Sequence, residues 1–125
     1  AEKEQAQGIF NRLRVRAPSL ETLIVNLSGG NQQKVVLGKS LLAKPQILLI
    51  DEPTKGIDVG AKTEIYKLMN ELVESGVSII MVSSDMPELV SMSDRCIVLS
   101  NSHITGEFTG SDITQDNVMR AAIAQ

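Results

Sequence analysis

The sequence predicts an α/β domain with a mostly parallel sheet flanked by helices. Two short, strongly apolar runs, residues 46–50 and 77–82, are typical of strands that are buried on both faces. A helical pattern over residues 59–75 separates them, and strands that alternate with helices indicate parallel pairing. Two further strand patterns near the C-terminus, separated by a short polar turn, predict a small meander at the edge of the sheet.

Composition and charge exclude several classes of protein. The 125 residues correspond to one domain or to part of one. A net charge of −3 provides no basic field for sequence-independent binding to a nucleic acid. The single cysteine excludes an internal disulfide, and no apolar run approaches the roughly 18–20 residues of a membrane span. Because no signal-peptide pattern opens the chain, we expect it to be soluble and cytosolic.

Helices dominate the first third of the chain. Apolar residues recur at helical spacing over residues 2–15, and Pro18 is expected to end that helix. After an irregular segment, Ser28 is a good N-cap for a second helix over residues 29–43. Three lysines in and just after this helix are expected to form a solvated basic face, namely Lys34, Lys39 and Lys44.

The rest of the chain alternates strands with helices. The helix over residues 59–75 has Asp58 as its expected N-cap and Gly76 as its C-terminal cap. A short helix, two strands joined at Asn101 and Ser102, and a final helix are expected over residues 87–92, 95–99, 104–108 and 112–124. Ligands of a parallel sheet bind at the carboxyl ends of its strands. The polar residues expected there are Asp51, Glu52, Ser83, Ser84 and Asp85.

The stretch 27–33, Leu-Ser-Gly-Gly-Asn-Gln-Gln, predicts an anion site at the start of a helix. Two glycines in the first turn leave backbone N–H groups open, and the helix dipole adds positive potential. The Ser28 hydroxyl can donate a hydrogen bond to a phosphate oxygen. The alternative is an ordinary capped helix, because short glycine-rich motifs also occur by chance.

Two acidic motifs follow. Asp51 and Glu52 emerge together from an apolar strand, so Asp51 could support Mg²⁺ and Glu52 could orient or deprotonate a water molecule. A buried strand that ends in a polar turn explains the same two residues without any chemistry. Asp58, in the Gly-Ile-Asp stretch 56–58, is well placed to cap the next helix, and by itself it is best explained by that capping.

Taken together, the order and spacing of these three motifs resemble the ABC-transporter ATPase family, whose fold is P-loop NTPase-like. Residues 27–33 resemble the signature motif of that family. Residues 47–52 resemble its Walker B strand with the catalytic glutamate, and residues 56–58 resemble its D-loop. The resemblance extends from about residue 21 to the C-terminus.

Within the family, the sequence is similar to the importers of monosaccharides such as ribose, galactose or xylose, which carry two ATPase domains in one polypeptide. Residues 83–88 resemble the second of these domains. Because the phosphate-binding loop of the family does not occur in residues 1–125, we expect them to be the C-terminal portion of that domain. The resemblance implies ATP and Mg²⁺ as cofactors. It also implies a second nucleotide-binding domain and a membrane permease as partners, no nucleic acid, and a sugar that only other subunits contact. The chain would then be cytoplasmic and peripheral, on the inner face of the cell membrane.

The same resemblance implies roles for nine residues. The signature would act on ATP held by the partner domain, and the residues binding that ATP would be Ser28, Gly29, Gly30, Asn31 and Gln32. Asp58 would link the two sites across the interface. Asp51 would support Mg²⁺, and Glu52 would polarise the attacking water. Ser84 would stand where the family has its switch histidine.

Two departures from the family pattern limit what the chain can do alone. The phosphate-binding loop, Gly-x-x-x-x-Gly-Lys-Ser/Thr, occurs nowhere in these 125 residues, and the glutamine loop has no evident counterpart. Ser84 can donate a hydrogen bond but cannot supply an imidazole. We therefore expect the parent protein to be an ATPase and the chain by itself to be inactive.

Two other functions stay open on the sequence alone. An ABC-type ATPase could act in translation or DNA repair, and copurification with ribosomes or DNA rather than with a permease would reveal it. A non-catalytic interaction module is also compatible with the missing phosphate loop. Among the remaining residues, His103 is expected in a solvated turn, and Cys96 is expected to be a small buried side chain.

Overall fold

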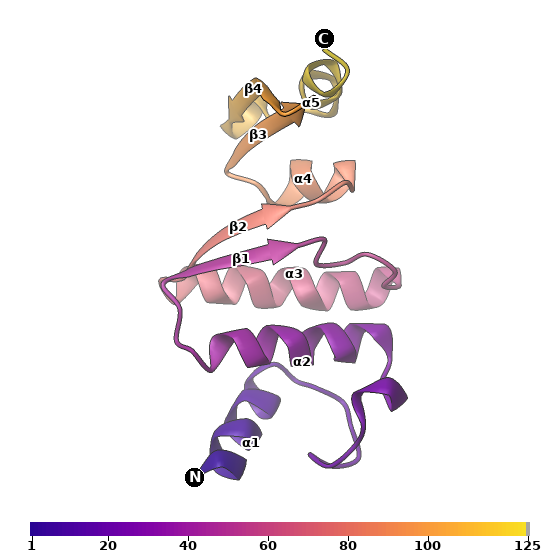
Figure 1. The fold of residues 1–125 in the computed structure, drawn as a ribbon, viewed down its shortest axis with the longest axis vertical. Helices are drawn as coiled ribbons and strands as arrows, with labels where there is room; N and C mark the ends of the chain where they lie inside the picture. The colour runs from indigo at the N-terminus through magenta and orange to yellow at the C-terminus, as the bar shows by residue number, and fades with distance from the viewer. Residues whose placement is uncertain (125) are drawn as a thin grey trace. The chain divides into compact units, whose positions relative to one another are not determined.

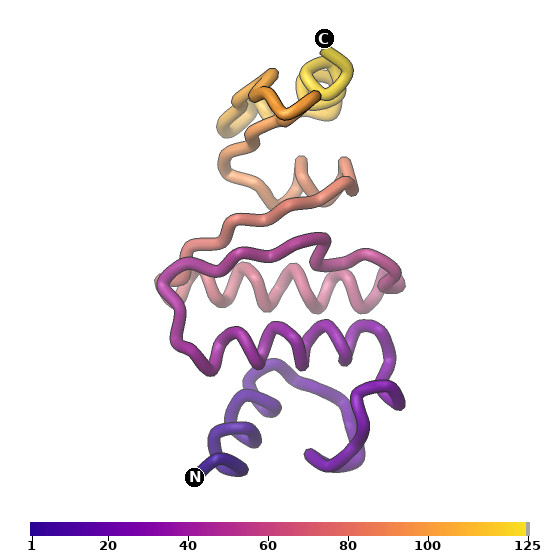
Figure 2. The backbone as a smooth tube through the Cα atoms, in the orientation of Figure 1, coloured from indigo at the N-terminus to yellow at the C-terminus, as the bar shows by residue number. Residues whose placement is uncertain are grey.

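Residues 1–124 are described by the computed structural model, and they form two compact units, of which the second begins at Ser83. Each unit has its own hydrophobic core. Figure 2 shows the path of the backbone through each of them. None of the helices in this described part of the chain is long and apolar enough to cross a membrane.

The first unit begins with α1 (Glu2–Arg12), a short 3₁₀ turn (Ile24–Asn26) and α2 (Gly29–Leu41). Because α1 ends at Arg12, the prediction that Pro18 ends this helix is wrong. Leu13 closes the helix, and Arg14 adopts a left-handed backbone conformation with a φ of 53°. The turn at Arg14 allows Leu13 and Val15, on either side of it, to be buried in the core.

A β-α-β arrangement follows. β1 (Ile47–Asp51) and β2 (Ser78–Val82) pair in parallel, and α3 (Val59–Glu74) connects them. The register aligns Ile47 with Ser78 and Asp51 with Val82. In Figure 1, α3 and then α2 lie below β1 as successive layers of this unit. The predicted α/β architecture with parallel pairing is therefore confirmed.

Only one face of this sheet is buried, which corrects the prediction that both strands are buried on both faces. Leu48 is 5% exposed, whereas Leu49, on the opposite face, is 73% exposed. On β2, Ile80 and Val82 are 56% and 60% exposed. Within residues 1–124 this sheet has two strands. The core of the first unit packs against the face that carries Leu48, so the side chains on the opposite face remain at the surface.

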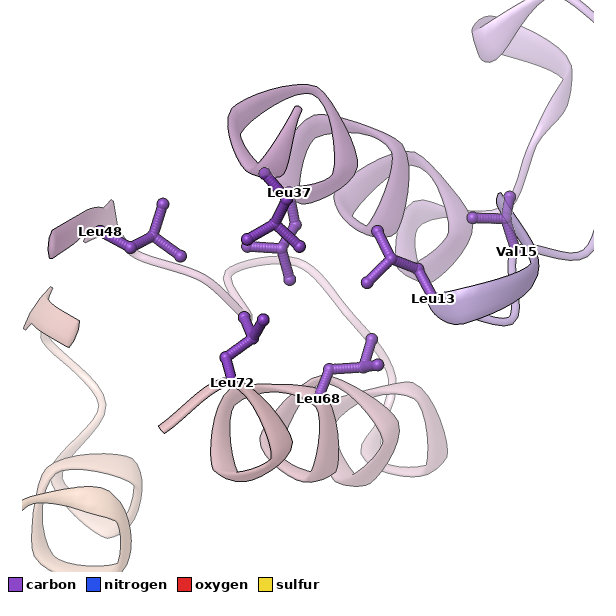
Figure 3. Packing of buried hydrophobic residues seen from close by; sticks show 7 residues of the cluster. Leu13, Val15, Leu37, Leu48, Leu68 and Leu72 are labelled. Carbon is purple, nitrogen blue, oxygen red and sulfur yellow. The ribbon is translucent and has the colours of Figure 1, made fainter. Parts of the chain in front are cut away.

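Aliphatic side chains from the helices and β1 form the core of the first unit (Figure 3). Its members include Leu37 and Leu41 of α2, Leu68 and Leu72 of α3, and Leu48 of β1. The two helices begin at the predicted residues because Ser28 and Asp58 cap them. This core packs α2 against α3, so the starts of the two helices lie near each other.

The second unit contains α4 (Met86–Met92), β3 (Arg95–Ser100), β4 (His103–Thr109), a 3₁₀ turn (Gly110–Asp112) and α5 (Gln115–Ala122). β3 and β4 form the predicted antiparallel hairpin, and Asn101 and Ser102 make its turn with positive φ angles of 48° and 64°. The hairpin is a sheet of its own rather than the edge of the β1–β2 sheet. α5 begins later than predicted because Thr114 is its N-cap.

Candidate functional site

Ser28 caps α2 as predicted. Its Oγ accepts two hydrogen bonds from Asn31, from the backbone N–H at 3.3 Å and from the side-chain Nδ2 at 2.9 Å. Gly29 and Gly30 are the first two residues of the helix, so their N–H groups have no acceptor within it. Since the positive end of the helix dipole lies at the same place, this helix start is suited to an anion.

A groove of about 310 Å³ lies at this helix start. The segment before α2 and the first turns of α2 and α3 line it, through Arg16, Ser28, Gly30, Asn31, Asp58, Gly60, Ala61 and Glu64. Asp58 caps α3, and its Oδ1 accepts the N–H of Ala61 at 3.0 Å. The groove thus brings residues of two predicted motifs together. Gln32 does not line it, and the Gln32 Nε2 donates to the Leu27 carbonyl at 3.1 Å.

The two glycines of the helix start differ in their surroundings. A Cβ on Gly30 would lie 2.7 Å from the Ala61 Cβ, so a glycine is needed there for α2 to approach α3 this closely. A Cβ on Gly29 would meet nothing nearer than the Gly56 carbonyl oxygen, at 3.8 Å. Gly30 therefore has a packing role, while the space beside Gly29 remains open.

Lys34 is buried, which corrects the prediction that it belongs to a solvated basic face. Its side chain is 4% exposed, and its Nζ lies 2.5 Å from the Glu64 Oε2 and 3.2 Å from the Arg14 carbonyl oxygen. The hydrogen bond from Lys34, together with its charge, holds the pKa of the Glu64 carboxyl below its ordinary value. Lys39 and Lys44 are exposed, as predicted. Lys34 therefore neutralises a carboxylate at the wall of the groove.

Asp51 and Glu52 stand at the carboxyl end of β1, as predicted. Asp51 is the last residue of the strand and is exposed. Glu52 has a left-handed backbone with a φ of 48°, and its N–H donates to the Val82 carbonyl at 2.8 Å. The β1–β2 pairing therefore continues to this residue. Directly after it, the chain turns away from the strand with Glu52 half-buried.

These two carboxylates offer oxygen ligands of the kind that Mg²⁺ takes from proteins. Within residues 1–124, no group of three or more His, Cys, Asp or Glu side chains is placed to hold a metal ion. Mg²⁺ is commonly bound by one or two carboxylates together with substrate phosphates and water. Asp51, with Glu52 beside it, fits that requirement.

Ser84 belongs to the second unit, in the short segment before α4. Hydrogen bonds connect the residues on either side of Ser84. The Ser83 Oγ donates to the Glu88 carboxylate and accepts the Asp85 N–H at 3.0 Å, and the Asp85 Oδ1 accepts the Glu88 N–H at 3.0 Å. Glu88 is 1% exposed, whereas Ser84 is at the surface. This arrangement fixes the backbone on both sides of Ser84.

Comparison with known proteins shows which family the chain resembles. A family model described as "ABC transporter" matches residues 1–55. The chain is 53% identical to the xylose import ATP-binding protein XylG of Moorella thermoacetica, over 98% of this chain and 24% of that protein. It is 55% identical to the galactose/methyl galactoside import ATP-binding protein MglA of Clostridium perfringens, over 93% of this chain and 22% of that protein. The chain therefore resembles the ABC transporter family.

The fold of the chain matches solved ATP-binding cassettes. It superimposes with a TM-score of 0.85 on a nucleotide-free ATP-binding cassette from an ABC transporter, at 22% identity, over 98% of this chain and 50% of that one. It also matches a dimeric, post-hydrolysis state of the cassette MJ0796 bound to ADP and Pi, with a TM-score of 0.75 and 25% identity, over 86% of this chain and 46% of that one. The chain spans about half of these cassettes and about a quarter of the curated relatives.

Three charged residues that were not predicted as site residues line the groove or lie beside Ser84. Glu64 and Arg16 line the groove, and Glu88 is buried beside the Ser84 segment. The pattern Asp-x-x-Glu over residues 85–88 is a capping signature that could have identified Glu88. Arg16 lies in an irregular segment, where no sequence periodicity locates it.

Proposed function

We propose that this chain is the C-terminal portion of the second nucleotide-binding domain of a subunit that hydrolyses ATP to drive monosaccharide import through an ABC transporter. The groove carries the proposal, because the Ser28 hydroxyl and the first N–H groups of α2 meet the Asp58 cap of α3 there. The identity of 53–55% to proteins named for the import of xylose, ribose and galactose supports a role in transport. It favours that role over translation or DNA repair.

In the proposed mechanism, the start of α2 acts on ATP bound to a partner domain. The Ser28 hydroxyl and the N–H groups of Gly29 and Gly30 donate hydrogen bonds to the γ-phosphate, where the helix dipole also favours negative charge. Asn31 completes this side of the groove, with Gln32 supporting the turn through its bond to the Leu27 carbonyl. Asp58, at the same groove, connects this contact to the start of α3.

The strand end has a second role, toward nucleotide bound on its own domain. Mg²⁺ bound to the phosphates supplies charge neutralisation, and Asp51 is the residue that would hold it. Glu52 orients the attacking water and accepts its proton. Ser84 donates a hydrogen bond toward the γ-phosphate, in place of an imidazole.

The proposal includes its partners. The full-length subunit pairs with another nucleotide-binding domain and with a membrane permease, and lies at the cytoplasmic face of the membrane. Sugar is contacted only by the other subunits. Copurification of the full-length subunit with a permease tests this assembly, whereas copurification with ribosomes or DNA would contradict it.

Substitution of Ser28 by arginine in the full-length subunit tests the action in trans. The bulk and charge of Ser28→Arg should block closure over the partner's nucleotide and abolish steady-state ATP hydrolysis. ATP binding at the phosphate loops, measured by equilibrium titration, should change much less. An equal loss of binding and hydrolysis would contradict the assignment.

A further inference from the structure

Asn31 makes three hydrogen bonds that together determine what Ser28 can do. The Asn31 Oδ1 accepts the backbone N–H of Arg16 at 2.8 Å. The Asn31 Nδ2 donates to the Ser28 Oγ at 2.9 Å, and the Asn31 backbone N–H donates to the same oxygen at 3.3 Å. The side-chain amide therefore lies between a backbone donor and the hydroxyl at the mouth of the groove.

The orientation of this amide follows from the chemistry of its neighbours. A backbone N–H can only donate, so the atom of Asn31 that faces Arg16 must be the oxygen. The NH₂ group then faces Ser28. A hydroxyl has two acceptor positions and one proton to donate. Because Asn31 supplies two donors to the Ser28 Oγ, the remaining capacity of that hydroxyl is its proton, which is left for an acceptor in the groove.

The Arg16 N–H is itself held in place. Lys34, buried beneath the helix start, donates from its Nζ to the Arg14 carbonyl at 3.2 Å. Glu64 accepts the Lys34 ammonium at 2.5 Å, and its other oxygen lies 3.6 Å from the Arg16 guanidinium. These contacts connect residues 14–16 to α2 and to α3, so the Arg16 N–H has a defined position from which it donates to Asn31.

We propose that Asn31 is a positioning residue that makes the Ser28 hydroxyl an obligate donor toward the phosphate oxygens of ATP. This inference rests on the proposed function, in which Ser28 contacts the γ-phosphate. It assigns Asn31 a role through Ser28 rather than through the nucleotide. An ionised phosphoryl group offers only acceptors, so a hydroxyl constrained to donate matches it, whereas a freely rotating hydroxyl does so only part of the time.

A double-mutant cycle in the full-length subunit tests the inference, with the nucleotide site that Ser28 does not contact disabled in every variant. Asn31→Ala should lower kcat for ATP hydrolysis by roughly tenfold, the weight of one hydrogen bond to a charged group. In a Ser28→Ala background, the same substitution should change kcat by less than about twofold, because the hydroxyl that it positions is gone. KM should change less than kcat in both backgrounds. Asn70→Ala, at an exposed asparagine of α3, is the matched control and should leave kcat unchanged.

Asn31→Asp provides a second measurement that does not depend on how well the alanine variant folds. It keeps an acceptor for the Arg16 N–H, but it places a carboxylate oxygen against Ser28 that captures the hydroxyl proton. Its loss of kcat should exceed that of Asn31→Ala. In the Ser28→Ala background, Asn31→Asp should lower kcat less, and the remaining loss should come only from the added negative charge.

Equal losses for Asn31→Ala with and without Ser28 would overturn the positioning role and leave the proposed function intact. A Ser28→Ala variant that keeps its full turnover would overturn both, because Ser28 would then not contact the reacting phosphate. The two failures are therefore distinguishable.

Discussion

Glu52 is the carboxylate that follows the end of β1, where we propose that it accepts a proton from the attacking water. Glu52→Gln keeps the shape of the side chain and removes the base. In the full-length subunit, this variant should bind ATP normally and turn it over about 10²–10⁴-fold more slowly at this site, the usual weight of general-base catalysis. Single-turnover hydrolysis with the other site disabled measures the effect, and an unchanged rate there would refute the role.

Glu64 contributes a stability that depends on pH. Its pKa is lowered from an ordinary value of 4.5, first by the hydrogen bond from Lys34 and then by that lysine's charge. The pair therefore stabilises the folded state above about pH 4.5, and this stabilisation is lost as the pH falls through the lowered pKa. Urea unfolding between about pH 6 and pH 3 should show a shallower acid loss for Glu64→Gln than for the unsubstituted chain.

A matched control lies on the same helix. Glu74→Gln removes an exposed carboxylate near the end of α3 and should preserve the acid dependence of the unsubstituted chain. If Glu64→Gln and the unsubstituted chain lose stability in parallel as the pH falls, the buried lysine does not act through this carboxylate.

At the level of elements, the close approach of α2 to α3 depends on one missing methyl group. Gly30→Ala would place a Cβ 2.7 Å from that of Ala61, so the helices would have to move apart. We expect a loss of about 1–3 kcal/mol in the free energy of unfolding, the usual cost of overpacking. Denaturant unfolding of the chain measures it.

Gly29→Ala is the control for this prediction. The new Cβ would meet nothing nearer than 3.8 Å, and alanine at a position with a compatible backbone conformation reduces the conformational entropy of the unfolded chain. Gly29→Ala should therefore unfold at the same or a higher denaturant concentration than the unsubstituted chain. Equal destabilisation by both substitutions would contradict the packing role of Gly30.

The sequence predicted where the helices begin better than it predicted which of their side chains are buried. Ser28, Asp58 and Thr114 cap helices through local hydrogen bonds, and capping of that kind is encoded within a few residues. The start of α5 was nevertheless predicted too early, at residue 112, because the 3₁₀ turn before Thr114 was not predicted. Residues 27–33 and 56–58 could be recognised in the sequence because each motif is a short stretch that contains a helix cap.

Features that depend on distant residues were missed. Lys34 shares the buried face of α2 with Gly30, Leu37 and Leu41, so its helical position pointed to burial, but its partner Glu64 lies on another helix. The exposure of Leu49 depends on how many layers cover the sheet, which an apolar run alone does not specify. Pairing and coverage of this kind are properties of the packed structure.

At the level of the whole molecule, the missing phosphate loop determines what the chain can bind. Phosphoryl transfer depends on positioning and charge neutralisation, and the loop normally supplies a row of N–H donors, a lysine and a hydroxyl for Mg²⁺. We expect the 125-residue chain alone neither to bind Mg·ATP tightly nor to hydrolyse it. Calorimetric titration of the purified chain tests this, with the full-length subunit as the positive control. Micromolar binding with steady phosphate release would contradict it.

The two units also differ in how far apart in the chain their pairing strands lie, and this sets an order of folding. Ser100 pairs with His103 across a tight turn. Ile47, in contrast, pairs with Ser78, and the whole of α3 lies between them in the sequence. Hairpins close in about 1–10 μs, while parallel pairs wait on a costly loop closure. In pulse-labelled hydrogen exchange during refolding, the amides of β3 and β4 should become protected before those of β1 and β2. Simultaneous protection of all four strands would instead indicate that the two units fold as a single cooperative body.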